Sequence, residues 1–496
     1  MFALETLSIS ALAAIAVPFI GALIIALTKR SSAKYIAILF AFVSLAASLF
    51  NSYVYFANGK AVTTFNYLSL GDANLIGFIF DNLSTLLAPA FVGIGLLVLI
   101  YAKGYLNEKN REHADVGHKR FYALFLVFIG AMAGLAYSST ILSQLIFFEI
   151  TGACSWGLIG YYQSDAAHSS SDKALIVTHI ASLGMFLASA VLFIMTGTFE
   201  LTALSQIEGP WKIFVLLCIM FAAWGKSAQL PLYMWLPSAM TAPTPVSAYL
   251  HGGSMVKVGV YVYARAIYSA GSIPESVAWV GIIGAIITLV FSFIEYLPQK
   301  DMKRLLAFST ISQLSYIFLA LSVAALAVAQ GQGLQEGAAQ MAFNGGVSHI
   351  FNHAFAKTLF FLVAGTIAFT VGMRDLTRMG GLIKKMPIVG VAFVCAALAV
   401  AGVPPFSGFF SKFQIFAGGF LVAQNSWLLL LIMIVALIET LACFAWFLMW
   451  INRAVLGEPS KEIASAQDVP GEIKFVLGVL IVMTVVSSFM AAAWLG

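Results

Sequence analysis

Charged side chains are scarce in this sequence: Asp, Glu, Lys and Arg make up 9% of its 496 residues, whereas 61% are hydrophobic. Soluble domains carry roughly 25% charged residues, so this composition excludes an ordinary soluble protein. The basic residues stand in short connectors between apolar runs and form no patch, which argues against nucleic-acid binding despite a net charge of +5. We therefore expect an all-α, polytopic integral membrane protein.

Cysteine is also rare, and no two cysteines lie close together in the sequence. Cys154, Cys218, Cys395 and Cys443 are scattered singly through apolar segments and form no C-x-x-C pair. Iron–sulfur, nickel and structural zinc sites need clustered ligands, so we expect this chain to bind no metal and no cofactor. Buried, unreactive thiols are the simpler interpretation.

Long apolar runs fill most of the chain, and polar breaks divide them into about 14 predicted transmembrane helices. A helix needs roughly 20 apolar residues to cross a bilayer. The predicted limits are 7–28, 34–56, 77–103, 121–137, 139–162, 173–197, 211–240, 246–269, 275–297, 304–328, 338–372, 387–423, 427–452 and 473–495. The first run lacks the basic leader of a signal peptide and is taken as span 1.

Spans 7 and 12 are expected to be broken helices. Span 7 contains Pro231 and Pro237, and the run 387–423 is too long for one straight span. Lys226 precedes the first break (GKSAQLP) and Lys412 follows the second (GVPPFSGFFSK). The two segments lie five spans apart, and an odd offset reverses their orientation. Spans 4–8 and 9–13 are therefore predicted to form two inverted five-helix repeats, an arrangement that places ion sites near the membrane midplane.

Four segments follow from this division. They are 1–120 with spans 1–3 and a connector, 121–270 with the first repeat, 271–453 with the second repeat, and 454–496 with a connector and span 14.

The basic residues of the connectors predict the orientation. Connectors after odd-numbered spans contain 19 Lys and Arg residues, and those after even-numbered spans contain 3, namely Lys60, Lys212 and Arg265. Cytoplasmic loops are enriched in Lys and Arg, so both termini are expected on the external or periplasmic side of the inner (plasma) membrane. Arg265, Glu295 and the cluster 300–304 lie at predicted span ends, where snorkelling to the interface would explain their charges.

Six charged residues lie in the middle of predicted spans, where each costs roughly 2.5–3.5 kcal/mol on insertion scales. They are Glu149, Lys226, Lys257, Lys357, Lys412 and Glu439. Residues of this kind generally mark ion or proton pathways.

Span 11 adds two histidines to this set. His349 and His353 share one helix face with Lys357 over about 12 Å. Histidine changes charge near neutral pH, which suits a proton relay. The alternative is that both histidines bond backbone carbonyls across a helix interface.

Glu149 and Lys226 are candidates for a coupled pair whose proton affinities change when the two separate. A static ion pair between two helices is the alternative. Lys257, one span further, would accept the proton of Lys226. His251, six residues before Lys257 and roughly opposite on the helix, is a weaker candidate.

His179 and Glu439 are further weaker candidates for the same path. An isolated histidine inside a span serves a helix contact as readily as a relay. Glu439 would be an exit group or the partner of Lys412.

Several segments resemble the antiporter-like membrane subunits. They are FFEITG, AAWGKSAQLP, LPSAMTAPTPVSAYLHGGSMVKVGVY, DMKRLLAFSTISQL, NHAFAKTLFFLVAG and GVPPFSGFFSKF. That family includes the M, L and N subunits of respiratory complex I, Mrp antiporter subunits and membrane-arm subunits of energy-converting hydrogenases. The stretches GYLNEKNREH, FLVFIGAMAGL, ITGACSWGLIGYYQSD and IVMTVVSSFMAAAWL are most similar to the D subunits of hydrogenase-4, of the formate hydrogenlyase type.

The resemblance implies a fold of 14 helices and a proton path through the ionisable residues named above. In the family's pattern, Glu149 is the glutamate of span 5, Lys226 and Lys257 are the lysines of spans 7 and 8, and Lys412 stands at a position where some relatives have glutamate. It also implies that nickel–iron and iron–sulfur centres belong to partner subunits.

The sequence therefore predicts a proton-translocating subunit in the membrane arm of a hydrogenase-4 type oxidoreductase complex. Its expected partners are other antiporter-like and small membrane subunits, peripheral hydrogenase-type subunits and the lipid bilayer. Two alternatives stay open: a D-type subunit of a multisubunit Mrp Na⁺/H⁺ antiporter, and a non-pumping membrane anchor for a peripheral oxidoreductase. The coupled ion is H⁺ or Na⁺.

Overall fold

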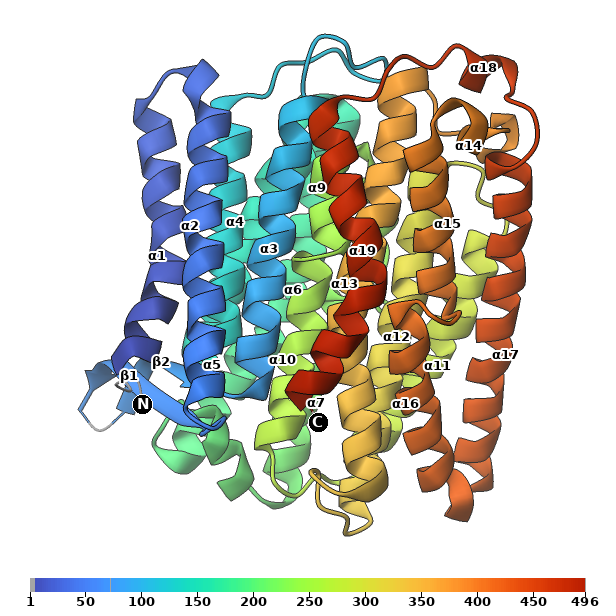
Figure 1. Ribbon diagram of the computed structural model, residues 1–496. Helices are drawn as coiled ribbons and strands as arrows, with labels where there is room; N and C mark the ends of the chain where they lie inside the picture. Colours follow the sequence, from blue (N-terminus) through green and yellow to red (C-terminus); the bar gives the residue numbers. More distant parts are fainter. Residues whose placement is uncertain (1–4, 72, 496) are drawn as a thin grey trace.

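The structure is a computed structural model that describes residues 5–71 and 73–495. It is a bundle of long helices that run roughly side by side, and both ends of the described chain lie at the same end of the bundle (Figure 1). At the opposite end, backbone hydrogen bonds join the connector 106–118 to α13, and the connector 372–381 to Leu456. We call this second end, formed by the connectors 106–118, 297–301, 372–381 and 456–470, the basic end.

In chain order the elements are α1 (Glu5–Leu27), α2 (Arg30–Ala57), β1 (Thr63–Leu70), β2 (Ala73–Phe80), α3 (Asn82–Tyr105), α4 (Lys119–Tyr137), α5 (Ile141–Ile159), α6 (Asp165–Thr196), α7 (Gly209–Lys226), α8 (Trp235–Ser238), α9 (Thr244–His251), α10 (Met255–Ser269), α11 (Glu275–Tyr296), α12 (Met302–Ala329), α13 (Gly337–Val371), α14 (Leu382–Lys385), α15 (Pro387–Ala401), α16 (Ser407–Val422), α17 (Trp427–Trp450), α18 (Lys461–Ala464) and α19 (Gly471–Leu495). Short 3-10 turns are η1 (Gly160–Tyr162), η2 (Leu201–Gln206), η3 (Ala239–Thr241), η4 (Leu376–Arg378) and η5 (Ala423–Asn425), and η6 (Ile451–Val455) is a π-helical turn.

Twelve helices in the described part of the chain are long and apolar enough to cross a membrane. Predicted spans 8 and 12 are not among them, because each is divided into two shorter helices, α9 with α10 and α15 with α16. The helical, membrane-spanning class is thus confirmed. The total of about 14 spans, the inverted repeats and the four segment boundaries stay predictions.

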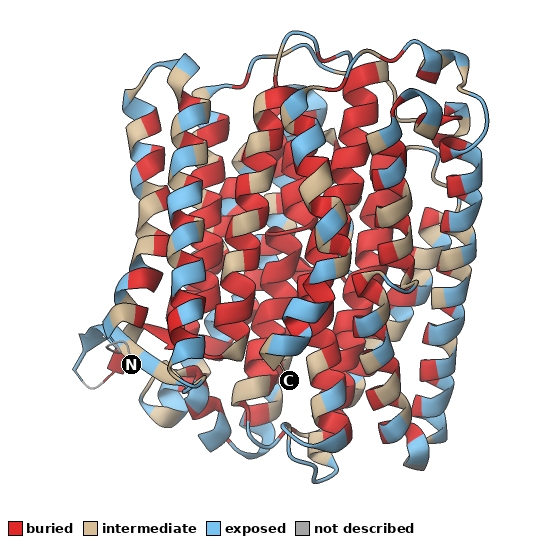
Figure 2. Ribbon diagram, in the orientation of Figure 1, coloured by how far each residue is buried: buried red, intermediate tan, exposed pale blue. Residues whose placement is uncertain are grey.

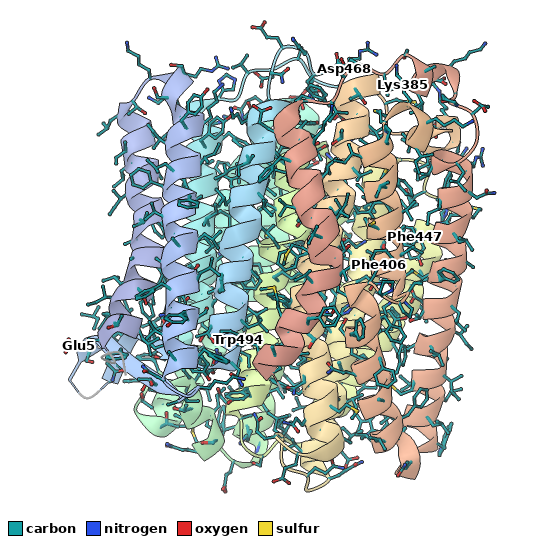
Figure 3. The ribbon with its side chains drawn as sticks, viewed as in Figure 1. Glu5, Lys385, Phe406, Phe447, Asp468 and Trp494 are labelled. Atoms are coloured by element: carbon teal, nitrogen blue, oxygen red, sulfur yellow. The ribbon has the colours of Figure 1, made fainter. Side chains whose placement is uncertain are left out.

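Both predicted helix breaks are present. α7 ends at Lys226 and irregular residues 227–234 lead into the short α8, while residues 402–406 separate α15 from α16. Phe406, the last residue of that second break, lies about halfway between the two ends of the bundle (Figure 3). Non-helical backbone at such a depth is tolerated where protein or a water-filled cavity surrounds it.

A third break, between α9 and α10, goes beyond the prediction. It contains Gly252, whose position is so close to α13 that an added Cβ would lie 1.9 Å from Oγ1 of Thr358. Only glycine permits this approach of the two backbones. The break ends α9 at His251 and starts α10 two residues before Lys257.

A β-hairpin departs from the all-α prediction. β1 and β2 pair antiparallel, and β2 includes residues that were assigned to the beginning of span 3. The segment NLIGFIF is rich in β-branched and aromatic side chains, which favour a strand. The helix begins only after Asp81, whose carboxylate accepts a hydrogen bond from the Ser84 amide at 2.9 Å.

The most buried helices lie in the middle of the bundle, whereas outer helices such as α1 and α2 expose many residues (Figure 2). In α12 and α13, 94% of the most apolar window is buried, compared with 28% in α2. α13 contacts α3, α9, α10, α12, α15, α16 and α19. Polar side chains on α12 and α13 therefore face other protein groups and not lipid.

Candidate functional site: a buried row of ionisable residues

The centre of the site is a contact between α10 and α13. Nζ of Lys257 lies 2.5 Å from Nδ1 of His353, and both side chains are buried. One turn earlier on α13, the ring of His349 lies 5.8 Å from the ring of His353, measured between centroids. His349 and His353 thus lie next to each other on one face of α13, as the spacing predicts. The lysine that contacts His353 is Lys257 of α10 and not Lys357 of the same helix.

His349 is held from two neighbouring helices. Its Nδ1 lies 2.8 Å from Oγ of Ser411 on α16, and its Nε2 lies 3.2 Å from Oε1 of Gln313 on α12. The alternative interpretation, in which both histidines bond backbone carbonyls, does not describe these contacts, which join side chains. Lys357, the third member of the face, donates to Oγ of Ser309 at 2.8 Å.

Lys226 lies at the end of α7, against α5. Its ammonium donates to the Phe148 carbonyl oxygen at 3.0 Å and lies 4.6 Å from the centroid of the Phe148 ring. A Cβ at Gly152 would lie 3.0 Å from the same Nζ, so this glycine makes room for the ammonium. The helix that carries Glu149 thus binds Lys226 through its backbone.

Glu149 has a different partner from the one predicted. Its Oε2 lies 3.0 Å from Nδ1 of His179 on α6, and no Lys226–Glu149 ion pair within 4 Å is present. The Glu149 and His179 side chains are 31% and 57% exposed, so the pair lies on the outer surface of this chain. His179, a weaker candidate in the sequence, therefore lies beside the best carboxylate candidate.

Lys412 and Glu439 meet through a tyrosine on α12. The Lys412 ammonium lies 4.6 Å from the centroid of the Tyr316 ring, and the Tyr316 hydroxyl donates to Oε2 of Glu439 at 2.5 Å. Oε1 of Glu439 accepts a hydrogen bond from Ser312 at 2.8 Å. Glu439 is thus a neighbour of Lys412 through Tyr316 and not by direct ion pairing.

We call the buried ionisable residues of these helices the buried row: Lys226, Lys257, His349, His353, Lys357, Lys412 and Glu439. The sequence did not single out α12, although side chains of this helix contact several members of the row. Ser309, Ser312, Gln313 and Tyr316 follow the spacing i, i+3, i+4, i+7 and lie on one face of the helix. Ser315 donates to Oε1 of Gln229 in the α7 break at 2.8 Å. The signal was available in the run STISQLSY, a polar stretch within an otherwise apolar helix.

His251 is the last residue of α9. The sequence spacing predicted that it lies roughly opposite Lys257 on one continuous helix. The break between α9 and α10 places the two residues on different helices, so that spacing does not apply. The side chain is fully buried, and its ring lies tilted against Phe361 with centroids 4.3 Å apart. Neither ring nitrogen has a hydrogen-bond partner among the described residues.

Two residues assigned to snorkelling are instead buried, and that assignment was wrong for both. Arg265 pairs with Asp81, and the two side chains are 0% and 1% exposed. Lys303 is buried and donates to the Ala242 carbonyl oxygen at 2.7 Å. Burial alone would raise the pKa of Asp81, but the charge and hydrogen bonds of Arg265 and Ser84 hold it below its usual value.

No group of three His, Cys, Asp or Glu side chains that could hold a metal ion occurs within residues 5–71 and 73–495. The four cysteines are free thiols. The location of metal centres in partner subunits stays a prediction.

Two family descriptions match this chain. Residues 138–439 match "NADH:quinone oxidoreductase/Mrp antiporter, TM", and residues 67–122 match "NADH-Ubiquinone oxidoreductase (complex I), chain 5 N-terminus". The chain belongs to this antiporter-like family. The first match covers the helices from α5 to the Glu439 region of α17, and hence every member of the buried row.

Curated relatives of this antiporter-like chain include Na⁺/H⁺ antiporter subunit A1 from two strains of Staphylococcus aureus. One is 38% identical and the other 37% identical over 340 residues, which make up 67% of this chain. The aligned part is 41% of each relative. This chain therefore matches about two fifths of the length of these curated relatives.

Two solved structures share the fold over nearly the whole chain. A chain of the Mrp complex from Dietzia sp. superposes with a TM-score of 0.82 at 20% identity, covering 98% of this chain and 96% of its own length. A chain of the membrane-bound sulfane sulfur reductase, an archaeal respiratory membrane complex, gives a TM-score of 0.80 at 24% identity, covering 98% and 95%. At these identities the similarity establishes the fold.

Proposed function

We propose that this chain moves protons across the membrane through the buried row. The observation that carries the proposal is the contact of Lys257 with His353, continued by the neighbouring ring of His349. Intramembrane ionisable groups that face each other inside a bundle are costly, and they typically serve ion or proton transfer. Imidazole can accept a proton at one nitrogen and release another from the second nitrogen.

The row has candidate ends in both halves of the chain. Lys226 lies beside the helix of Glu149, and Lys412 lies beside Tyr316, which binds Glu439. Between these ends, hydroxyl and amide groups of α12 contact His349 and Lys357. Such groups both donate and accept hydrogen bonds, so they suit transfer between neighbouring ionisable residues.

We further propose that the chain works in the membrane arm of a hydrogenase-4 type complex, in which a peripheral redox reaction drives the proton transfer. The support is the sequence similarity of the stretches GYLNEKNREH and ITGACSWGLIGYYQSD. Both termini would then face the external side, with the basic end in the cytoplasm, as the connector charges predict.

A subunit of an Mrp-type Na⁺/H⁺ antiporter is the second candidate. It is favoured by the curated relatives, which are named as antiporter subunits, and by the fold shared with the Mrp complex. An Mrp complex needs no redox partner. A membrane anchor that transfers no protons is the third reading.

The composition of the gently solubilised complex separates these proposals. A hydrogenase-4 type complex is expected to contain peripheral subunits with nickel and iron–sulfur clusters. Metal analysis and mass spectrometry of the purified complex measure this directly. Purification with small membrane subunits and no redox metal would exclude the hydrogenase assignment and favour the antiporter. An assembled complex in sealed vesicles that translocates no ions would leave only the anchor.

A further inference from the structure

We propose that Glu112 collects protons at the basic end and passes them to the buried row along Tyr105, Thr244, Ser247 and His251. We call these five residues the access file. The proposal rests on the proposed proton transfer and deepens it, because it names where protons enter or leave the row and which ion the route admits.

The file begins at a cavity of about 430 Å³ among the connectors of the basic end, lined by Glu112, Asp301 and Arg374. The Glu112 side chain is 12% exposed, and its Oε1 lies 3.4 Å from Nε of Arg374. Nε of Arg374 also lies 3.2 Å from a carboxylate oxygen of Asp301. Glu112 therefore has one oxygen at the cavity, within a charged group that holds it in place.

The other carboxylate oxygen of Glu112 points into the protein. Oε2 accepts a hydrogen bond from the hydroxyl of Tyr105 at 2.7 Å, and that hydroxyl lies 3.3 Å from Oγ1 of Thr244. Tyr105 and Thr244 are fully buried. Three oxygens thus form a continuous line from a solvent-facing cavity to the first residue of α9.

The line continues along one face of α9. Thr244, Ser247 and His251 follow the spacing i, i+3, i+7 and span about 10 Å. Ser247 and His251 are both 0% exposed, yet the Ser247 hydroxyl and both ring nitrogens of His251 have no hydrogen-bond partner among the described residues. Buried polar groups are almost always hydrogen-bonded to protein or water. These three atoms therefore mark positions for bridging waters along the face.

The inner end of the file reaches the row. His251 ends α9 directly against α13, because its ring lies 4.3 Å from the ring of Phe361 between centroids, and Phe361 is one helical turn after Lys357. The next residue, Gly252, approaches Thr358 of the same helix. The proton that arrives at His251 is thus beside the part of α13 that carries His353 and Lys357.

Transfer along the hydroxyls balances at each step. Glu112 takes one proton from the cavity. The Tyr105 hydroxyl, which donates to Oε2 while the carboxylate is charged, then turns its O–H toward Oγ1 of Thr244, so that its oxygen accepts the proton of the carboxylic acid as its own proton passes to Thr244. Thr244 passes its own proton through a bridging water to Ser247, and Ser247 passes its own through a second water to a ring nitrogen of His251, which holds it until it moves to the row. Each hydroxyl gains one proton and loses one, and then rotates back.

The same geometry excludes Na⁺ from this route. A sodium ion would need to pass between the oxygens of Tyr105 and Thr244, which are 3.3 Å apart and fully buried. Only a proton, which moves by exchanging bonds, can cross this contact.

The test uses the complete complex reconstituted into liposomes, with proton translocation followed by a pH-sensitive dye and divided by the amount of assembled complex. Glu112→Gln is expected to reduce translocation by about tenfold or more, since it removes a group that transfers protons. The matched control is Glu108→Gln, an exposed glutamate on the same connector. It should leave the rate unchanged.

Two further pairs of variants cover the case in which Glu112→Gln does not assemble. Tyr105→Phe should reduce translocation, whereas Tyr101→Phe, which removes a buried hydroxyl bound to Leu362 and Thr366 outside the file, should not. Thr244→Val should reduce translocation and Thr244→Ser should restore it, which a purely structural role would not explain.

Rates equal to those of the controls in the Glu112, Tyr105 and Thr244 variants would overturn the access file. The same preparation should include Lys226→Ala. If that variant is inactive while the file variants are normal, the proposed function stands and only the file is wrong. If the Lys226 variant and the file variants are all normal, both proposals fail.

Discussion

Lys257 and His353 are 96 residues apart in the sequence, and Nζ of the first lies 2.5 Å from Nδ1 of the second. When Lys257 is charged, its ammonium can only donate, so Nδ1 of the imidazole is then the acceptor and the ring proton resides on Nε2. Nε2 of His353 has no partner among the described residues and is therefore free to pass that proton on. The contact joins the first predicted repeat to the second inside the core.

This contact predicts different results for two substitutions of His353. His353→Phe keeps the ring's bulk but removes both nitrogens, so proton translocation per assembled complex should fall by about 100-fold. His353→Gln keeps an oxygen that can accept a hydrogen bond from Lys257, and it should lose less. Dye-based translocation in vesicles, measured beside the amount of assembled complex, checks this order. Near-normal and equal rates in both variants would refute the relay.

Lys226 is predicted to change its charge in each cycle. Lys226→Ala should abolish translocation while the complex still assembles, because the ammonium hydrogen-bonds, among the described residues, only a backbone carbonyl and a hydroxyl of α5. Lys226→Arg should restore little, since arginine does not release its proton in proteins. Lys109→Ala, at an exposed connector position, serves as the control. Full translocation by the Lys226→Ala complex would remove this residue from the mechanism.

The buried pair of Asp81 and Arg265 is predicted to be a structural element. Asp81→Asn leaves the guanidinium without its charge partner and should reduce the free energy of unfolding by about 3–5 kcal/mol. Combining it with Arg265→Gln should cost less than the sum of the two single changes. Thermal unfolding of the purified protein in detergent measures all three variants. Additive effects would show that the two residues do not stabilise each other.

The same pair predicts how stability changes with pH. Because the pKa of folded Asp81 is lowered, its stabilising contribution is complete above the unfolded-state pKa of about 4. It is lost progressively as the pH falls from there through the lower folded-state pKa. Unfolding temperatures of wild type and Asp81→Asn should therefore converge only in acid. A difference that disappears already between pH 7 and pH 5 would contradict this assignment.

Glycines where two helices pack closely predict how alanine substitutions change the stability of the protein. A Cβ at Gly259 would lie 2.1 Å from the Ala223 carbonyl oxygen, and one at Gly408 would lie 1.9 Å from the Ala399 carbonyl oxygen. Gly259→Ala and Gly408→Ala should each destabilise the protein by about 1–3 kcal/mol, because backbone must move apart. Gly478→Ala on α19 meets nothing within 4 Å and should be neutral or slightly stabilising. Thermal unfolding in detergent compares the three, and equal stability would contradict the close crossings.

Many features of the fold could be predicted because they depend on short stretches of sequence. The breaks after Lys226 and before Lys412 were predicted from proline and run length. The break after His251 could not be predicted in this way, because it depends on the close approach of Gly252 to Thr358 on another helix. The β-hairpin was missed because β2 is as apolar as the helix that follows it.

The sequence by itself determined that this is a membrane protein, which family it resembles and which ionisable residues lie within its spans. Hydropathy and spacing along one helix are local properties, so they can be read without knowing how helices pack. Only the tertiary structure decided the partners: Glu149 with His179, Lys257 with His353, and Arg265 with Asp81. Each pair joins different segments of the chain. A partner's identity therefore depends on how the helices are packed and rotated, and no stretch of sequence contains that information.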